Sequence, residues 1–113
     1  MLRLGERVEV KGRTLTVTHT AFECLPRTRE FLIGLAREGA TVTYGELREH
    51  LRLPYAPVGM GRLLDLLSED CDRRGEPSLA AVVVNRTTGE VGHDNAGAAA
   101  AERARVYSQP HWS

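Results

Sequence analysis

Hydrophobic and polar residues alternate along residues 7–18, "RVEVKGRTLTVT", on both sides of a short interruption at Lys11 and Gly12. The apolar members of this period-two pattern are Val8, Val10, Leu15 and Val17. Alternation around a glycine-containing turn is typical of a β-hairpin that turns one face toward the core. We therefore predict an N-terminal β-hairpin.

The apolar spacing becomes that of a helix after this segment. Pro26 suits the first position of a helix, and a glycine at position 39 is a common helix end. Between them, the apolar stripe consists of Phe31, Leu32, Leu35 and Ala36. The pattern predicts a first helix that begins at Pro26 and ends at Gly39.

Two further helices follow after short joins. Thr43 and Glu46 have the spacing of a capping box, which predicts a short helix over 44–52. A third helix is predicted from about Val58 to Arg74, after two prolines that a helix interior excludes. Its apolar face carries Met60, Leu63, Leu64, Leu67 and Cys71. Its opposite, solvated face carries Arg62, Asp65, Glu69, Asp72 and Arg73, with Arg62–Asp65 or Glu69–Arg73 as intrahelical pairs.

The last third of the chain begins with the β-branched apolar run "SLAAVVVN" at 78–85, which predicts a buried strand. Residues 85–92 are expected to form the tip and return of a second hairpin. Asp94 or Asn95 then caps an alanine-rich helix over 96–107. The tail contains Trp112, which either folds back onto the core or stays exposed as a partner-binding anchor.

The predicted order is a hairpin, three short helices, a second hairpin and a closing helix. Three helices followed by a two-stranded wing make up the winged-helix variant of the helix–turn–helix. We predict a single α+β domain of this kind over 1–113. Its parts are the N-terminal hairpin (1–20), the helix–turn–helix core and wing (22–92), and the C-terminal helix and tail (95–113).

Three stretches of the sequence support this prediction: "FECLPRTREFLIGLAREGATVTYGEL", then "PVG", then "VVVNRTTGEVG". Their order resembles the C-terminal domain of the alkylguanine-DNA alkyltransferases and the alkyltransferase-like proteins. The resemblance covers 22–92, about two-thirds of the chain, and "TYGEL" is its most specific part. It implies a winged-helix fold that binds DNA, with Tyr44 near the DNA backbone.

The residues that carry the family's chemistry are missing. Its Pro-Cys-His-Arg motif aligns with Ala80, Ala81, Val82 and Val83, and its base-flipping arginine aligns with Ala56. Cys71 lies on the apolar face of the third helix, where burial makes a thiol unreactive. The cluster "GHDN" at 92–95 is interpreted as turn and cap residues. We expect a non-enzymatic protein without a cofactor.

Residues at four places are candidates for DNA contacts. Arg62 and Tyr55 lie at the start of the third helix, and Arg86 lies at the tip of the predicted wing. The first hairpin contributes Arg7, Lys11 and Arg13, which track a phosphate backbone or protect an exposed edge strand. Tyr44 at a helix N-terminus contacts a phosphate or packs half-buried against the hairpin.

Composition leaves a second hypothesis open. The 15 basic residues equal the 15 acidic ones, whereas DNA-binding domains usually carry excess positive charge. The alternative to double-stranded DNA is therefore a protein partner, bound through Asp65, Glu69 or Trp112. Cys24 and Cys71 are too few for a zinc motif and are expected to be reduced and structural. No apolar run is long enough for a membrane span, and we expect a cytoplasmic protein.

Overall fold

A computed structural model describes residues 2–10, 12–56, 59–84 and 96–112. It begins with the predicted hairpin, formed by β1 (Arg7–Val10) and β2 (Arg13–Thr16). The strands are antiparallel, with Val8 opposite Leu15, and both of these side chains are buried. The alternating pattern thus predicted the hairpin and its inward face correctly.

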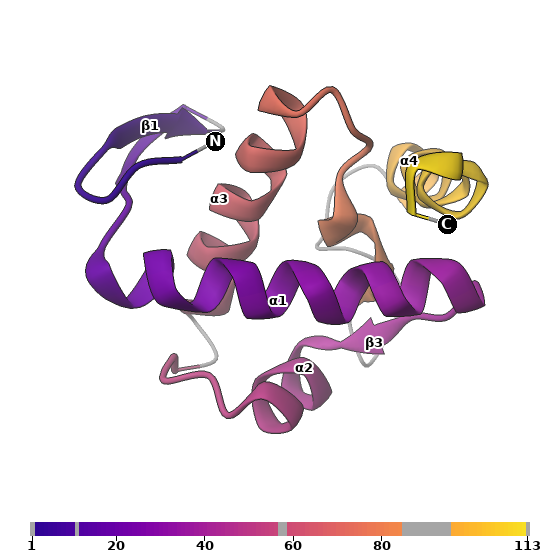
Figure 1. The fold of residues 1–113 in the computed structure, drawn as a ribbon, viewed down its shortest axis with the longest axis horizontal. Helices are drawn as coiled ribbons and strands as arrows, with labels where there is room; N and C mark the ends of the chain where they lie inside the picture. Colours follow the sequence, from indigo (N-terminus) through magenta and orange to yellow (C-terminus); the bar gives the residue numbers. More distant parts are fainter. Residues whose placement is uncertain (1, 11, 57–58, 85–95, 113) are drawn as a thin grey trace.

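Helix α1 (His19–Glu38) crosses the front of the molecule in Figure 1. The prediction that Pro26 opens this helix is wrong, because the Thr18 hydroxyl accepts a hydrogen bond from the Ala21 amide at 3.1 Å and caps the helix earlier. Pro26 lies inside the helix on its exposed side. The predicted end is confirmed, because Gly39 adopts the left-handed conformation with φ 66°. The first helix is therefore long rather than short.

The capping box of the second helix is confirmed. Strand β3 (Val42–Thr43) leads directly into α2 (Tyr44–Leu51). The Thr43 hydroxyl accepts from the Glu46 amide at 3.2 Å, and a Glu46 carboxylate oxygen accepts from the Thr43 amide at 3.0 Å. These two bonds satisfy two of the backbone amides that a helix start leaves without a partner.

Helix α3 (Met60–Arg73) lies behind α1, between the hairpin and the C-terminal helix (Figure 1). Its five predicted apolar residues are all buried. The prediction of a solvated opposite face is wrong for Asp65, which is only 7% exposed. Strand β2 supplies Arg13 to this carboxylate, so the helix is covered on that side as well. Of the two predicted intrahelical pairs, Glu69–Arg73 forms, and Asp65 pairs with Arg13 instead of Arg62.

The apolar run at 78–85 is mostly not a strand. A turn of 3-10 helix, η2 (Leu79–Val82), is followed by the two-residue strand β4 (Val83–Val84). Strand β4 pairs in parallel with β3, and Val83 lies opposite Val42. A short apolar run is compatible with any fully buried segment, so its pattern does not distinguish these structures. The predicted second hairpin at 85–92 and the caps Asp94 and Asn95 lie outside the described residues.

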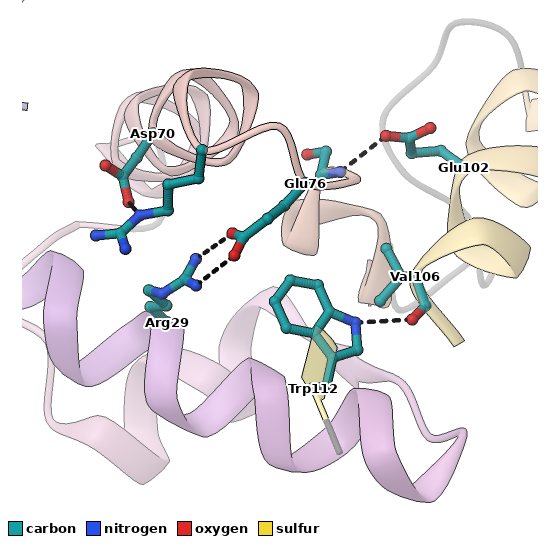
Figure 2. A network of polar contacts seen from close by, with 8 residues as sticks. Arg29, Asp70, Glu76, Glu102, Val106 and Trp112 are labelled. Carbon is teal, nitrogen blue, oxygen red and sulfur yellow. Dashed lines mark hydrogen bonds and ion pairs between the residues drawn. The ribbon is translucent and has the colours of Figure 1, made fainter. Parts of the chain in front are cut away.

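The chain closes with α4 (Ala96–Ser108) and η3 (Pro110–Trp112). Trp112 is 3% exposed, and its Nε1 donates to the Val106 carbonyl at 2.8 Å (Figure 2). The tail therefore folds back onto the core, as one of the two predicted alternatives has it. Trp112 is not available as an exposed anchor, because folding already buries its indole ring.

Polar contacts join α1 to the segment between α3 and η2 (Figure 2). Arg29 of α1 donates two hydrogen bonds to Glu76, at 2.7 and 2.8 Å. Nearby, Glu102 of α4 accepts from the Ser78 amide at 2.8 Å. The α+β class is confirmed, whereas the winged-helix assignment stays a prediction. Among the helices that the structure describes, none has the length and apolarity needed to cross a membrane.

Candidate nucleic-acid interface

A cavity of about 370 Å³ lies between the hairpin and α3, and we name it the hairpin cavity. Its walls come from β2, the start of α1, the segment before α3 and α3 itself. Three residues predicted for DNA contact line this cavity: Arg13, Tyr55 and Arg62. The fold thus brings together side chains from three separate segments.

Tyr55 is held in place by its neighbours. Its backbone carbonyl accepts from Arg48 Nη1 at 3.2 Å. Its ring packs against Gly59, where an added Cβ would lie 3.2 Å from the Tyr55 Cδ1, so a larger residue at 59 would displace the ring. Burial raises the pKa of the Tyr55 phenol. The hydroxyl is therefore protonated at neutral pH and can donate a hydrogen bond.

Arg62 is exposed and makes no hydrogen bond or ion pair with any residue that the structure describes. A guanidinium carries five N–H donors, so this side chain is available to an anionic ligand. Arg13 differs, because its Nη2 lies 2.7 Å from Asp65 Oδ2. Its side chain is still 51% exposed, against 9% for Asp65.

A second cavity, of about 430 Å³, lies between α3, η2 and α4 and is named the α4 cavity. Tyr44, which is half-buried, lines it together with Arg13 and Asp65. Arg13 borders both cavities, so its ion pair with Asp65 stands between them. Tyr44 and Tyr55 therefore line neighbouring but separate hollows on either side of this pair.

The α4 cavity carries negative charge. Burial raises the pKa of Glu102, but hydrogen bonds from the Ser78 amide and from Arg105 outweigh it and leave that pKa lowered. Glu102 is therefore ionised at neutral pH, and its carboxylate lines the cavity with that of Asp65. Each of these carboxylates has an arginine beside it, Arg13 beside Asp65 and Arg105 beside Glu102. Two arginines and no carboxylate line the hairpin cavity, whereas one arginine and two carboxylates line the α4 cavity.

The positions that align with the family's cysteine motif lie at this second cavity. Ala80 and Ala81 line it, while Val82 and Val83 are fully buried. The two serine hydroxyls in the lining, Ser68 and Ser78, hydrogen-bond to each other at 2.7 Å. Within the described part of the chain, no group of His, Cys, Asp or Glu side chains could hold a metal ion.

Neither a family model, nor a curated protein, nor a solved structure matches the chain. The resemblance to the alkyltransferase domain therefore rests on the motifs in the sequence.

The other predicted residues are placed as follows. Arg7 is exposed on β1 and lines neither cavity. Lys11, Arg86 and the "GHDN" cluster at 92–95 lie outside the described residues. The residues of the protein-partner hypothesis are engaged within the fold, since Asp65 pairs with Arg13, Glu69 pairs with Arg73, and Trp112 is buried.

The interpretation of α3 as a helix with a broad exposed face needs correction. Eight of its 14 residues are buried, and Asp65 and Asp70 are among them. The exposed residues of α3 are Gly61, Arg62, Asp72 and Arg73. Because Asp72 and Arg73 lie at the C-terminal end, Arg62 is the only exposed charge near the start of the helix.

Sequence reasoning missed three arginines around the end of α2: Arg27, Arg48 and Arg52. Arg27 Nη1 donates to the Leu51 carbonyl at 2.8 Å, and Arg48 donates to Tyr55 as described. Arg52 follows α2 directly, with φ 50°. The signal in the sequence was the density of arginine around "LREHLRLP", but arginine is so frequent here that no single one stood out.

Proposed function

We propose that the protein is a non-catalytic DNA-binding domain. The observation that carries this proposal is the convergence of Arg13, Tyr55 and Arg62 from three segments on the hairpin cavity. Guanidinium groups and a phenol hydroxyl are donors, and a duplex backbone presents phosphate acceptors. The resemblance in "TYGEL" points to the same class of ligand.

The distribution of charged residues favours one face of the molecule for DNA binding. The chain is neutral as a whole, so binding depends on how its charges are distributed. Arg62 is exposed with no described partner, and Arg13 is half exposed, whereas the carboxylates of Asp65 and Glu102 line the other cavity. We place the duplex against the hairpin and the start of α3.

We propose no catalytic role because two alanines and two valines occupy the positions that align with the cysteine motif, Ala80, Ala81, Val82 and Val83. Ala80 and Ala81 offer no nucleophile, and Cys71 is fully buried. Burial also raises the pKa of the Cys71 thiol, which lowers its thiolate fraction. We expect the protein mass to stay unchanged after incubation with a duplex that contains alkylated guanine.

The test is binding to a fluorescein-labelled duplex of about 20 base pairs, followed by anisotropy from about 25 to about 200 mM NaCl. We expect the logarithm of the affinity to fall with the logarithm of salt with a slope of about −3 or steeper. Arg62→Ala should reduce the magnitude of this slope by about 1.

The matched control is Arg3→Ala. Arg3 is exposed near the other end of α3, where Glu6 binds both its amide and Arg73, so its loss should leave binding unchanged. Absence of binding at the lowest salt would overturn the proposal. Retention of a protein partner by the same preparation would then favour the protein-interaction hypothesis.

A further inference from the structure

The turn after α2 holds a side chain in an unusual backbone conformation. Arg52 has φ 50° and ψ 49°, and it is the only non-glycine residue with positive φ in the described part of the chain. The other four described residues with positive φ are glycines: Gly5, Gly12, Gly39 and Gly75. A side chain in this left-handed region is strained, which is why glycine is usual there.

The capping bonds do not explain the choice of arginine. The Arg52 amide donates to the Glu49 carbonyl at 3.2 Å, and the Leu53 amide donates to the Arg48 carbonyl at 2.9 Å. Both bonds use backbone atoms, so glycine at position 52 would form them without strain. The Arg52 side chain is exposed and makes no hydrogen bond or ion pair with a described residue. Within the described fold, no polar contact of the Arg52 side chain therefore compensates for the strain of its backbone.

Two other arginines fix the turn in place. Arg27 reaches from α1 to the Leu51 carbonyl, and Arg48 reaches forward to the Tyr55 carbonyl. Leu53, between these points, is buried at 5% exposure. The turn is thus attached on both sides of Arg52 and presents that side chain from a defined position.

The charges around the turn are mostly positive. Arg27 and Arg52 are exposed and Arg48 is half-buried, while Glu49 is the exposed carboxylate of the same helix end. Glu46, at the other end of α2, is occupied by the capping box. On α1, the exposed Glu23 lies four residues before Arg27 and next to His19. Three guanidinium groups against the two exposed carboxylates of Glu23 and Glu49 leave a positive balance, which suits a polyanion. Tyr55 connects this turn to the hairpin cavity, because its carbonyl binds Arg48 and its ring lines the cavity.

We propose that the turn after α2 contacts the phosphate backbone of DNA through Arg52, with Arg27 and Arg48 as positioning residues. This inference rests on the proposed function and extends its interface from the hairpin cavity across the turn. Contact with a ligand would explain why arginine stands at this strained position, because the side chain has no role within the described fold.

The decisive variant is Arg52→Gly, because it removes the charge and relieves the strain together. We expect its melting temperature to stay equal to that of the parent or to rise by a few degrees. Affinity for the labelled duplex should fall about three- to ten-fold, and the magnitude of the salt slope should fall by about 1. Arg52→Asn should behave in the same way, since asparagine also tolerates this conformation. Arg52→Lys should restore most of the affinity.

The positioning role has its own readout. Arg48→Met removes the donor to Tyr55 and should weaken binding, and Arg48→Lys, which can still donate to that carbonyl, should restore it. Arg3→Ala again serves as the control for loss of a surface arginine.

The outcomes separate the two proposals. If the parent binds and Arg52→Gly binds with the same affinity and slope, the inference about the turn is wrong and the proposed function stands. If the parent does not bind DNA at any salt concentration, the proposed function itself fails. Binding of a protein by the turn, lost in Arg52→Gly without any DNA affinity in the parent, would overturn both.

Discussion

Arg29 and Glu76 form a two-bond ion pair whose side chains are only 15% and 4% exposed. The Arg29 guanidinium also lies 5.7 Å from the centre of the Trp112 ring (Figure 2). The Glu76 carboxylate raises the pKa of Arg29 through these hydrogen bonds, so the pair stays charged. It links α1, the segment before η2, and the tail in one place.

We expect Glu76→Gln to destabilise the protein by about 3 kcal/mol, because it leaves a largely buried guanidinium without its carboxylate. Urea unfolding followed by circular dichroism measures the change. Glu69→Gln is the matched control, since Glu69 pairs with Arg73 near the surface and its loss should cost less than about 1 kcal/mol. Equal losses of stability in Glu76→Gln and Glu69→Gln would contradict the prediction that the buried ion pair contributes more than the surface pair.

Acid should weaken the contact between the N-terminal segment and the end of α3. Hydrogen bonds from Arg73 and from the Arg3 amide lower the pKa of Glu6 from about 4.5 to about 2. A lowered folded-state pKa stabilises the fold above pH 4.5, and this stabilisation is lost as pH falls toward 2. The urea midpoint of the parent should therefore decrease over this interval.

Glu6→Gln should flatten that decrease, because glutamine does not titrate. If the urea midpoint of Glu6→Gln depended on pH as that of the parent does, titration of Glu6 would not be the cause of the acid-dependent loss of stability.

Trp112 is the only tryptophan in the chain, so its fluorescence reports on the tail alone. Because the ring is buried, we expect blue-shifted emission that moves to the red on unfolding, at the same urea concentration as the loss of helix. Trp112→Phe should cost about 1 kcal/mol for the lost bond to Val106, and Trp112→Ala about 3 kcal/mol or more. An earlier fluorescence transition would show that the tail detaches independently.

The two cysteines should react slowly with a thiol reagent in the native protein. Cys24 and Cys71 are free and buried, at 2% and 0% exposure, and burial raises the pKa of Cys71. Labelling at neutral pH, followed by mass spectrometry, should be slow in buffer and rapid for both thiols in urea. Fast modification of Cys71 under native conditions would contradict its inert position.

Features that depend on neighbours in sequence were predictable. The capping box needs only Thr43 and Glu46, three residues apart, and the hairpin needs only alternation around a turn. The start of α1 was missed although Thr18 is an equally local signal, because Pro26 also satisfies a rule for helix starts. Thr18 as a cap and Pro26 as a first helical residue are both valid signals for the start of a helix, and the hydrophobic pattern did not decide between them.

Features that depend on distant residues were not predictable. Asp65 is buried because Arg13, 52 residues away, covers it, and no helical periodicity contains that information. The left-handed conformation of Arg52 was missed because glycine is the usual marker for it. At the candidate site, residue types were therefore easier to predict than their partners.

The parallel pairing of β3 with β4 has a consequence for the order of folding. Val42 and Val83 close a loop of about forty residues, and closing a long loop costs entropy before any contact forms. The hairpin, α1 and the capped α2 consist of local contacts and can form earlier. We expect substitutions at Val42 or Val83 to speed unfolding while they barely slow folding. The turn that carries Arg52 lies within this loop, so its sequence can diversify without touching the residues that close it.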